Sequence, residues 1–515
     1  DAPMNALLKR ILTACLLVTL IGAAGWSQAW TLERQRDLFS SLSIGAYAKE
    51  NVGSLTLARL ANGIPVVVRK SDDNRILGIK AVLLGHVANT PLEKAGLEAV
   101  TLTMLGKGSA AYPYAEVQRL QFERSASLGA SVAGFDHSSF DLAVLDTYFD
   151  EMFAVWADAF LHPSWNTEEF PRVMNSLRMT RQQAENDPFS LAVKTINERF
   201  FAGHPYAASW EGAGSSLDTI VLDDVKRYWK DTFTAGRLMI VAVGSFDIPK
   251  LIGRLNATFG KLPASAYARP PVPGFAGRVT PDVILQEFPE SEGVAYVRGN
   301  FALPSPDHPD YPALVVAFTL LDDVLFEIVR TKNGACYSTW SRVHGFTAGY
   351  GSIVVYRTAV PGAVKRMIDE SIGVLLKGQS LSGRVSASAE GKSGIGGSTE
   401  EAPSGVVVPK VQTGGVFVPI AEALPYYKRQ FVTGFYEGQQ TNLQVADEIA
   451  SSVVYRGDYR SWLLFLDRVN AVTPADVERV ARAYLRDNPV LWVVVGSKDL
   501  LDGVKREEWL RFTGE

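Results

Sequence analysis

The side chains that most often bind metal ions are scattered along this sequence. No two of its histidines show the i, i+4 spacing that places two imidazoles on one face of a helix. The histidines are His86, His137, His162, His204, His308 and His344. The sequence therefore predicts no zinc site contained within this chain.

Motifs for nucleophilic catalysis and phosphate binding are missing as well. No G-x-S-x-G lies between a strand and a helix, and Cys336 has no evident histidine partner in the sequence. The stretch GKSGIGGS, residues 391–398, has glycines and a lysine but lacks the spacing and the flanking elements of a P-loop. We interpret it as linker.

One helical segment carries the right pattern for packing and the wrong residues for chemistry. KAGLEAVTLTMLGKGS, residues 94–109, places apolar side chains at helical spacing and ends on Gly-Lys-Gly. Its polar-facing positions hold threonine, and we expect nothing there that binds or ionises. The segment predicts a helix that packs against a core and carries no metal-binding or ionisable side chain at its polar-facing positions.

The elements around this helix occur twice. LDDVKRYWKDTFTAGRLMIVAVGSFD, from residue 222, aligns without a gap with TPADVERVARAYLRDNPVLWVVVGSKD, from residue 473. Val225 corresponds to Val477 and Gly244 to Gly496, so both pairs are 252 residues apart (477 − 225 and 496 − 244). Each copy predicts a helix, a short turn and a buried strand, which indicates duplication and two similar α+β domains.

Composition sets limits on the class of protein. The 515 residues exceed one ordinary core, and 47% hydrophobic with 21% charged residues is typical of a soluble globular protein. A net charge of −4 gives no basic excess to attract nucleic acid, so we expect no nucleic-acid partner.

The chain divides into four parts by pattern. Residues 1–29 hold extra N-terminal residues and a predicted signal peptide, because the apolar run 11–25 is shorter than the ~20 residues of a membrane span. We expect export, in a bacterium to the periplasm, without stable membrane insertion after signal removal. A domain of residues 30–267, a Pro/Gly-rich linker of 268–282 and a domain of 283–515 follow, the last with a flexible insertion at about 378–415.

The helix at residues 94–109 resembles the zinc helix of the pitrilysin/insulinase-type (M16) metallopeptidases, in which a glycine precedes H-x-x-E-H. The alignment places Ala99 and Thr103 at the histidine positions and Leu102 at the glutamate position. The later helix that supplies a further glutamate ligand in the family corresponds to PRVMNSLRMTRQQA from residue 171, which contains no acidic residue. The resemblance covers roughly residues 54–501 and implies that this chain binds no zinc.

A second segment keeps what the family requires. LFEIVRTKNGACYSTWS, from residue 325, resembles the family segment R-x-x-x-G-x-x-Y, with Arg330 and Tyr337 at its ends and Gly334 in its turn. The resemblance implies that Arg330 binds a peptide carbonyl and that Tyr337 stabilises the developing oxyanion. The segment TLLDDVLFEIV before it lacks the glycine-rich turn common in the family, so its local geometry is expected to differ.

These observations give one interpretation and two alternatives. The resemblance implies an α+β fold of two similar domains, each an antiparallel-rich sheet packed against helices, which together form half of a clam-shell. It implies a non-zinc subunit that is inactive alone and supplies Arg330 and Tyr337 to peptides at the zinc site of an H-x-x-E-H partner, in a heterodimer or larger complex. A structural subunit or a stand-alone peptide-binding protein remain the alternatives.

Overall fold

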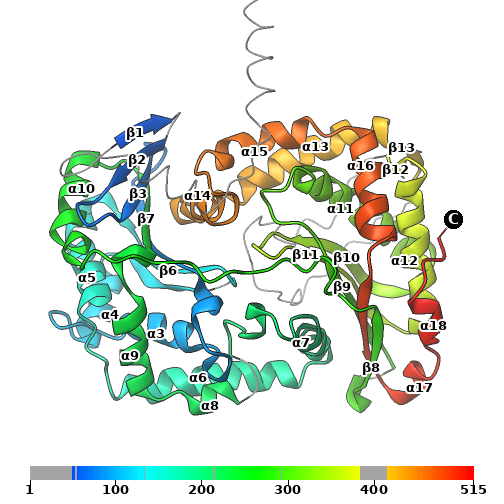
Figure 1. The fold of residues 1–515 in the computed structure, drawn as a ribbon, viewed down its shortest axis with the longest axis horizontal. Helices are drawn as coiled ribbons and strands as arrows, with labels where there is room; N and C mark the ends of the chain where they lie inside the picture. Colours follow the sequence, from blue (N-terminus) through cyan, green and yellow to red (C-terminus); the bar gives the residue numbers. More distant parts are fainter. Residues whose placement is uncertain are drawn as a thin grey trace, which may run out of the picture.

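The computed structural model describes residues 49–52, 55–132, 134–212, 215–291, 293–382 and 415–514. Two similar halves lie side by side in Figure 1. The first half contains β1 (Lys49–Val52), β2 (Leu55–Arg59), β3 (Pro65–Lys70), β4 (Ile76–Leu84), α3 (Leu97–Leu105), α4 (Tyr114–Glu123), β5 (Ser127–Ser131), β6 (His137–Leu145), α5 (Phe149–Leu161), α6 (Glu169–Glu185), α7 (Pro188–Phe200), α8 (Ser216–Thr219), α9 (Leu222–Thr232), β7 (Leu238–Gly244) and α10 (Ile248–Ala257).

The second half begins with β8. It contains β8 (Asp282–Glu287), β9 (Ala295–Ala302), α11 (Tyr311–Leu325), the π-helix η8 (Phe326–Lys332), β10 (Cys336–His344), β11 (Tyr350–Thr358), α12 (Pro361–Leu376), β12 (Gln379–Leu381), β13 (Phe417–Pro419), α13 (Ile420–Glu437), α14 (Asn442–Arg456), α15 (Ser461–Asn470), α16 (Pro474–Ala481), the π-helix η9 (Arg482–Arg486), β14 (Val490–Gly496), α17 (Lys498–Leu501) and α18 (Arg506–Trp509).

Each half is built around one mixed sheet with mostly antiparallel pairing. The first sheet has the strand order β1-β2-β3-β7-β4-β6-β5, and the second has the order β10-β11-β9-β14-β8. Strands β4, β7 and β9 are buried along nearly their whole length, as expected for strands covered on both faces. The predicted α+β class, with antiparallel-rich sheets packed against helices, is confirmed.

The sequence repeat occupies equivalent places in the two sheets. Strand β7 pairs in parallel with β3 and antiparallel with β4, and β14 pairs in parallel with β8 and antiparallel with β9. In both copies the preceding helix, α9 or α16, begins with an acidic residue in its first turn. The 252-residue offset therefore relates elements of the same topology.

The two halves exchange one helix each. Helix α14 of the second half packs on strands β4, β6 and β7 of the first sheet, and α7 of the first half packs on β9 and β14 of the second. Val445 and Ile449 of α14 lie in one apolar cluster with Leu57 and Val241 of the first sheet. Each sheet is thus covered on one face by its own helices and on the other by the neighbouring half.

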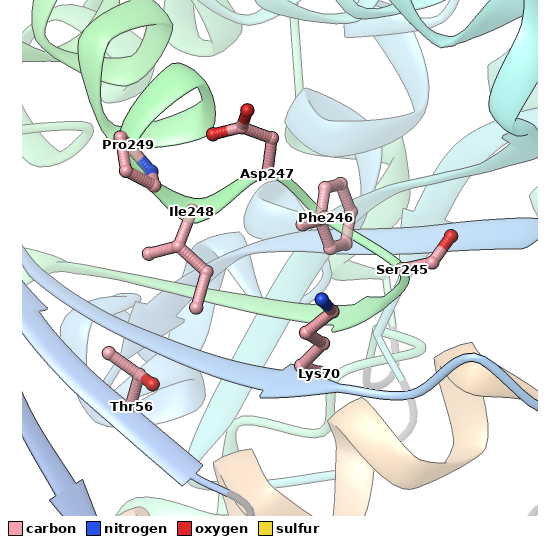
Figure 2. A pocket seen from close by; sticks show the side chains of 7 residues that line it. All are labelled: Thr56, Lys70, Ser245, Phe246, Asp247, Ile248 and Pro249. Carbon is pink, nitrogen blue, oxygen red and sulfur yellow. The ribbon is translucent and has the colours of Figure 1, made fainter.

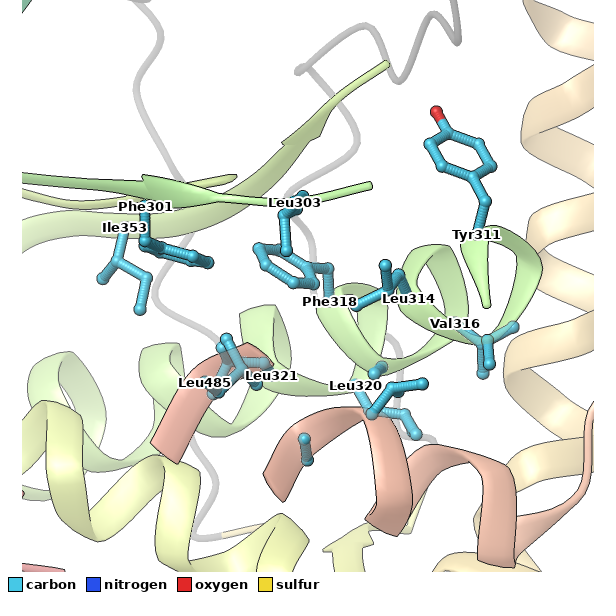
Figure 3. Close-up of a cluster of buried hydrophobic side chains, with 14 of the residues drawn as sticks. Phe301, Leu303, Tyr311, Leu314, Val316, Phe318, Leu320, Leu321, Ile353 and Leu485 are labelled. Carbon is cyan, nitrogen blue, oxygen red and sulfur yellow. The ribbon is translucent and has the colours of Figure 1, made fainter. Parts of the chain in front are cut away.

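Helix α11 covers the inner face of the second sheet. Pro312 stands in its first turn, where the missing N–H has no helical partner to lose. Phe301 and Ile353 from the strands, and Leu303 just after β9, point toward Leu314, Phe318 and Leu321 of the helix (Figure 3). The rings of Phe301 and Phe318 stack with their centroids 5.9 Å apart, so α11 is held firmly under the sheet.

Two sequence expectations fall wholly or largely outside the described residues. The signal peptide lies in residues 1–48, and most of the expected insertion lies in 383–414. The strands that flank this second segment, β12 and β13, pair antiparallel, with Gln379 opposite Pro419. Residues 263–281, which include most of the predicted linker, contain no helix or strand. None of the helices in the described ranges is long and apolar enough to cross a membrane.

Candidate functional site

Helix α3 holds the three positions that resemble a zinc motif. Gly96 precedes the helix with a φ of 88°, a left-handed conformation that favours glycine, so the chain turns sharply from η2 (Leu92–Lys94) into α3. Ala99 and Leu102 are buried, and the Thr103 hydroxyl donates 2.8 Å to the carbonyl of Ala99. No side chain at these positions is free to hold a metal ion.

The same helix does carry an ionised group, which corrects the expectation that nothing on it ionises. Glu98 is 1% exposed and forms an ion pair with Arg237, which is also 1% exposed. The Tyr228 hydroxyl donates to Glu98 at 2.5 Å, and the Ser138 hydroxyl donates to the other carboxylate oxygen. Arg237 Nε in turn donates 2.6 Å to the carbonyl of Leu84.

The Glu98–Arg237 ion pair and its hydrogen bonds hold α3 against the sheet. Burial by itself would raise the pKa of Glu98, but Arg237, His86 and the two hydroxyl donors outweigh burial and lower it. Burial would likewise lower the pKa of Arg237, and the Glu98 carboxylate raises it instead. Both groups therefore stay ionised at neutral pH, and the helix is anchored without a metal ion.

The surroundings of α3 offer no ligand set either. Helix α6 packs beside α3 and has acidic residues only at its ends, where Glu169 pairs with Arg172 and with Lys107. Within the described ranges no group of three or more His, Cys, Asp or Glu side chains could hold a metal ion. Alanine and leucine supply no donor atoms, so the residues at the motif positions do not fit zinc.

Arg330 and Tyr337 lie together at the start of β10. The Arg330 guanidinium stacks over the Tyr337 ring at 5.5 Å and over the Phe326 ring at 4.8 Å. Gly334, with a φ of 57°, closes the turn between them, and its N–H donates 2.9 Å to the carbonyl of Arg330. Tyr337 is 48% exposed, so its phenol is open to a ligand while the stacked guanidinium restrains its ring.

The segment before Arg330 forms helix where the family often has a glycine-rich turn. Helix α11 runs directly into the π-helix η8, which carries Arg330 in its last turn. Widened π turns are frequent at functional sites because they shift the side chains that follow. Here the wider turn brings Arg330 back over Phe326 and toward Tyr337.

Asp322 joins this helix to strand β10. Its carboxylate accepts a hydrogen bond of 2.6 Å from the backbone N–H of Ser341. Burial, together with the neighbouring Asp323 carboxylate, outweighs the opposing effects of the Ser341 amide and Arg342 and raises the pKa of Asp322 to about 7. The helix that leads to Arg330 is therefore linked to β10 through a carboxyl group that titrates near pH 7.

We expect Asp322→Asn to stabilise the protein at pH 8 and to leave it unchanged at pH 4. A raised folded-state pKa means that the native state binds more protons than the unfolded state, so this carboxyl group makes stability fall as pH rises from about 4 to about 7. Asparagine keeps an acceptor oxygen for Ser341 but carries no charge. Urea unfolding should show a gain of roughly 1–2 kcal/mol at pH 8. Equal effects at both pH values would contradict this assignment.

The two predicted groups of site residues, the zinc-motif positions and the Arg/Tyr pair, lie in different halves. Ala99, Leu102 and Thr103 are on α3 in the first half, whereas Arg330 and Tyr337 are on η8 and β10 in the second. No hydrogen bond, ion pair or ring contact between described residues joins the two groups. The helix and the Arg/Tyr pair thus do not form one site within this chain.

Comparisons with known proteins support the resemblance to the M16 family. Residues 219–378, which include Arg330 and Tyr337, match the family model described as the peptidase M16 inactive domain. A relative from Helicobacter pylori, named non-peptidase homolog YmxG, is 22% identical over 345 residues, or 64% of this chain and 78% of the relative. Part of this chain is thus similar to an inactive domain of M16 peptidases.

Solved structures share the fold of this chain. A peptidase M16 inactive domain from Pseudomonas fluorescens has a TM-score of 0.69 and 17% identity, and the match covers 86% of this chain and 98% of that one. The periplasmic protease PqqL from Escherichia coli has a TM-score of 0.67 and 17% identity, with 89% of this chain matched to 48% of that one. This chain therefore corresponds in fold to about half of the longer protease.

Two other features lie outside these groups. His204 accepts from the Tyr206 N–H at 3.1 Å through Nδ1, while its Nε2 lies 2.8 Å from the carbonyl of Pro273, so it fixes a turn. An open hollow of about 630 Å³ lies at the start of α10 (Figure 2). Its lining residues are Thr56, Lys70, Ser245, Phe246, Asp247, Ile248 and Pro249. None of them belongs to either predicted group.

Proposed function

We propose that this chain is the non-zinc subunit of a heteromeric zinc metallopeptidase that degrades peptides. The observation that carries this proposal is the asymmetry between the two halves. Helix α3 has no metal-binding side chain at the motif positions, whereas Arg330 and Tyr337 are both present as a stacked pair whose tyrosine is exposed. Such a pair is of use only where a substrate reaches it.

The proposed partner is an M16-type subunit that carries H-x-x-E-H and binds zinc. The metal would activate the attacking water and polarise the peptide carbonyl. Arg330 would donate to a carbonyl of the peptide backbone, because its guanidinium offers a planar fork of N–H groups and has no ion pair or hydrogen bond with the described residues. The Tyr337 phenol would donate to the oxyanion that develops during attack.

The match with one half of PqqL supports this arrangement, because that protease is about twice the length of the matched region. We also propose export to the bacterial periplasm, on the basis of the apolar run at residues 11–25. The alternative is a non-catalytic structural or peptide-binding protein. The name of the Helicobacter pylori relative, a non-peptidase homolog, favours that alternative.

The test is to purify the natively expressed full-length chain by an affinity tag. Co-purifying proteins, zinc content and hydrolysis of a peptide mixture would be measured for the chain alone and for any complex. We expect a zinc-free, inactive chain alone and an active complex with an H-x-x-E-H subunit. A chain that stays alone and inactive, or a complex as active without this chain, would overturn the proposal in favour of the alternative.

A further inference from the structure

Arg357 on strand β11 has an unusual backbone. Its φ of 58° lies in the left-handed region, which is strained for a residue that has a side chain. Only Ser125 and Trp165 share this feature among the described residues other than glycine. Such conformations persist where the surrounding fold enforces them, and they concentrate at binding sites.

A β-bulge explains how the fold enforces this conformation. The pairing of β11 with β9 shifts register between Val355 and Thr358, while its pairing with β10 keeps one register on both sides of Arg357, at Ser338–Tyr356 and Cys336–Thr358. Bulges redirect side chains and are common next to active sites. Arg357 is accordingly exposed between the buried residues Val355 and Thr358.

The bulge places Arg357 next to the Arg330/Tyr337 pair. Because Cys336 pairs with Thr358 and Ser338 with Tyr356, Arg357 occupies the position on β11 that faces the Tyr337 position on β10. The Tyr337 ring centroid lies 6.3 Å from that of Tyr356, the residue before Arg357. Tyr337 therefore has one guanidinium stacked on its ring and a second on the neighbouring strand.

Neither guanidinium is neutralised within the described part of the chain. Arg330 and Arg357 form no ion pair and no side-chain hydrogen bond with described residues. The nearby acidic group is Asp187, which interacts electrostatically with Tyr356. Its carboxylate already accepts a hydrogen bond of 2.7 Å from the Ser190 N–H at the start of α7. The guanidinium groups of Arg330 and Arg357 therefore have no hydrogen-bond acceptor for their side chains among the described residues.

We propose that Arg330 and Arg357 form a subsite for a carboxylate of a bound peptide. Guanidinium groups bind carboxylates through paired, charge-assisted hydrogen bonds, and the two arginines offer two such sets of donors. The carboxylate is either the C-terminus of the peptide or an acidic side chain. This inference rests on the proposed function, since it assigns the chemistry of the peptide that reaches Arg330 and Tyr337.

The test compares matched fluorescent peptides bound to the full-length chain and to its complex. One pair differs only in a free or amidated C-terminus, and the second pair only in an internal Glu or Gln. We expect about tenfold tighter binding of the charged member in one of the pairs, which identifies the source of the carboxylate. Equal affinities within both pairs would overturn the proposal.

Variants at Arg357 separate charge from backbone conformation. Arg357→Gln and Arg357→Gly should both bring the affinity ratio close to one, although glycine relieves the left-handed strain and should leave the protein well folded. Arg357→Lys should restore part of the preference. Arg482→Gln removes an exposed arginine elsewhere in the same half and should keep the wild-type ratio. A preference unchanged in Arg357→Gln would contradict the subsite.

Turnover by the complex distinguishes the two proposals. If the affinity ratio does not depend on Arg357 but Tyr337→Phe still lowers turnover, the carboxylate subsite is wrong and the proposed function stands. If the Arg357 variants abolish the preference while Tyr337→Phe leaves turnover unchanged, the subsite stands and the catalytic role is wrong.

Discussion

Substituting Tyr337 by Phe is expected to lower kcat of the assembled peptidase about 100-fold, the effect of removing one oxyanion donor. Phenylalanine retains the ring over which Arg330 stacks, so the local packing and the assembly of the complex should persist. KM should change little, because the lost hydrogen bond forms mainly in the transition state. The measurement is steady-state hydrolysis of a fluorogenic peptide by complexes of equal zinc content.

A matched tyrosine provides the control. Tyr436 on α13 is 61% exposed, and Tyr436→Phe removes the same hydroxyl type from a position outside both predicted groups. Its kcat should equal that of the wild type. Normal turnover in a stoichiometric Tyr337→Phe complex would refute the role assigned to the phenol and would favour a structural subunit.

Substituting Glu98 by Gln is expected to reduce the free energy of unfolding by about 3–5 kcal/mol, because Arg237 would keep a buried charge without its carboxylate. Arg237→Met should reduce the free energy of unfolding by a similar amount, since it leaves the Glu98 carboxylate buried without its ion-pair partner. The double variant should be less destabilised than the sum of the single variants, because it removes both charges. Urea unfolding of the full-length chain gives all three values.

An exposed ion pair gives the reference value for this experiment. Glu151 is 43% exposed in its pair with Arg124, and Glu151→Gln should cost below about 1 kcal/mol. A loss as small as this in Glu98→Gln would show that the buried network does not anchor α3. Addition of a metal chelator should not change the unfolding of the wild type, since the anchor contains no metal ion.

The repeat made the fold predictable, because Val225/Val477 and Gly244/Gly496 mark strands in the same topological position. The empty helix was also predictable, since residue types at Ala99, Leu102 and Thr103 exclude ligands directly. The partners of Glu98 were not, because Ser138, Tyr228 and Arg237 follow it by 40, 130 and 139 residues. A glutamate among apolar helix positions was the available signal.

Local spacing explains why the Arg330/Tyr337 contact was easier to predict than the involvement of Arg357. Seven residues and one glycine turn bring Arg330 and Tyr337 together, so the sequence motif itself implies their proximity. The position of Arg357 depends on a register shift between β11 and β9, and no residue type in that strand indicates a bulge. The exchange of α7 and α14 could not be predicted either, because the periodicity of a helix does not identify the sheet that the helix covers.

That helix exchange has a consequence for biosynthesis. The first sheet is complete in sequence at Gly244, but α14, which covers one of its faces, begins only at Asn442, 198 residues later (442 − 244). At synthesis rates of 5–20 residues per second, about 10–40 s separate the two on the ribosome. During that interval Leu57 and Val241 lack the apolar side chains of α14 that cover them in the finished fold, so we expect the first half to reach its full stability only after the second half has been made.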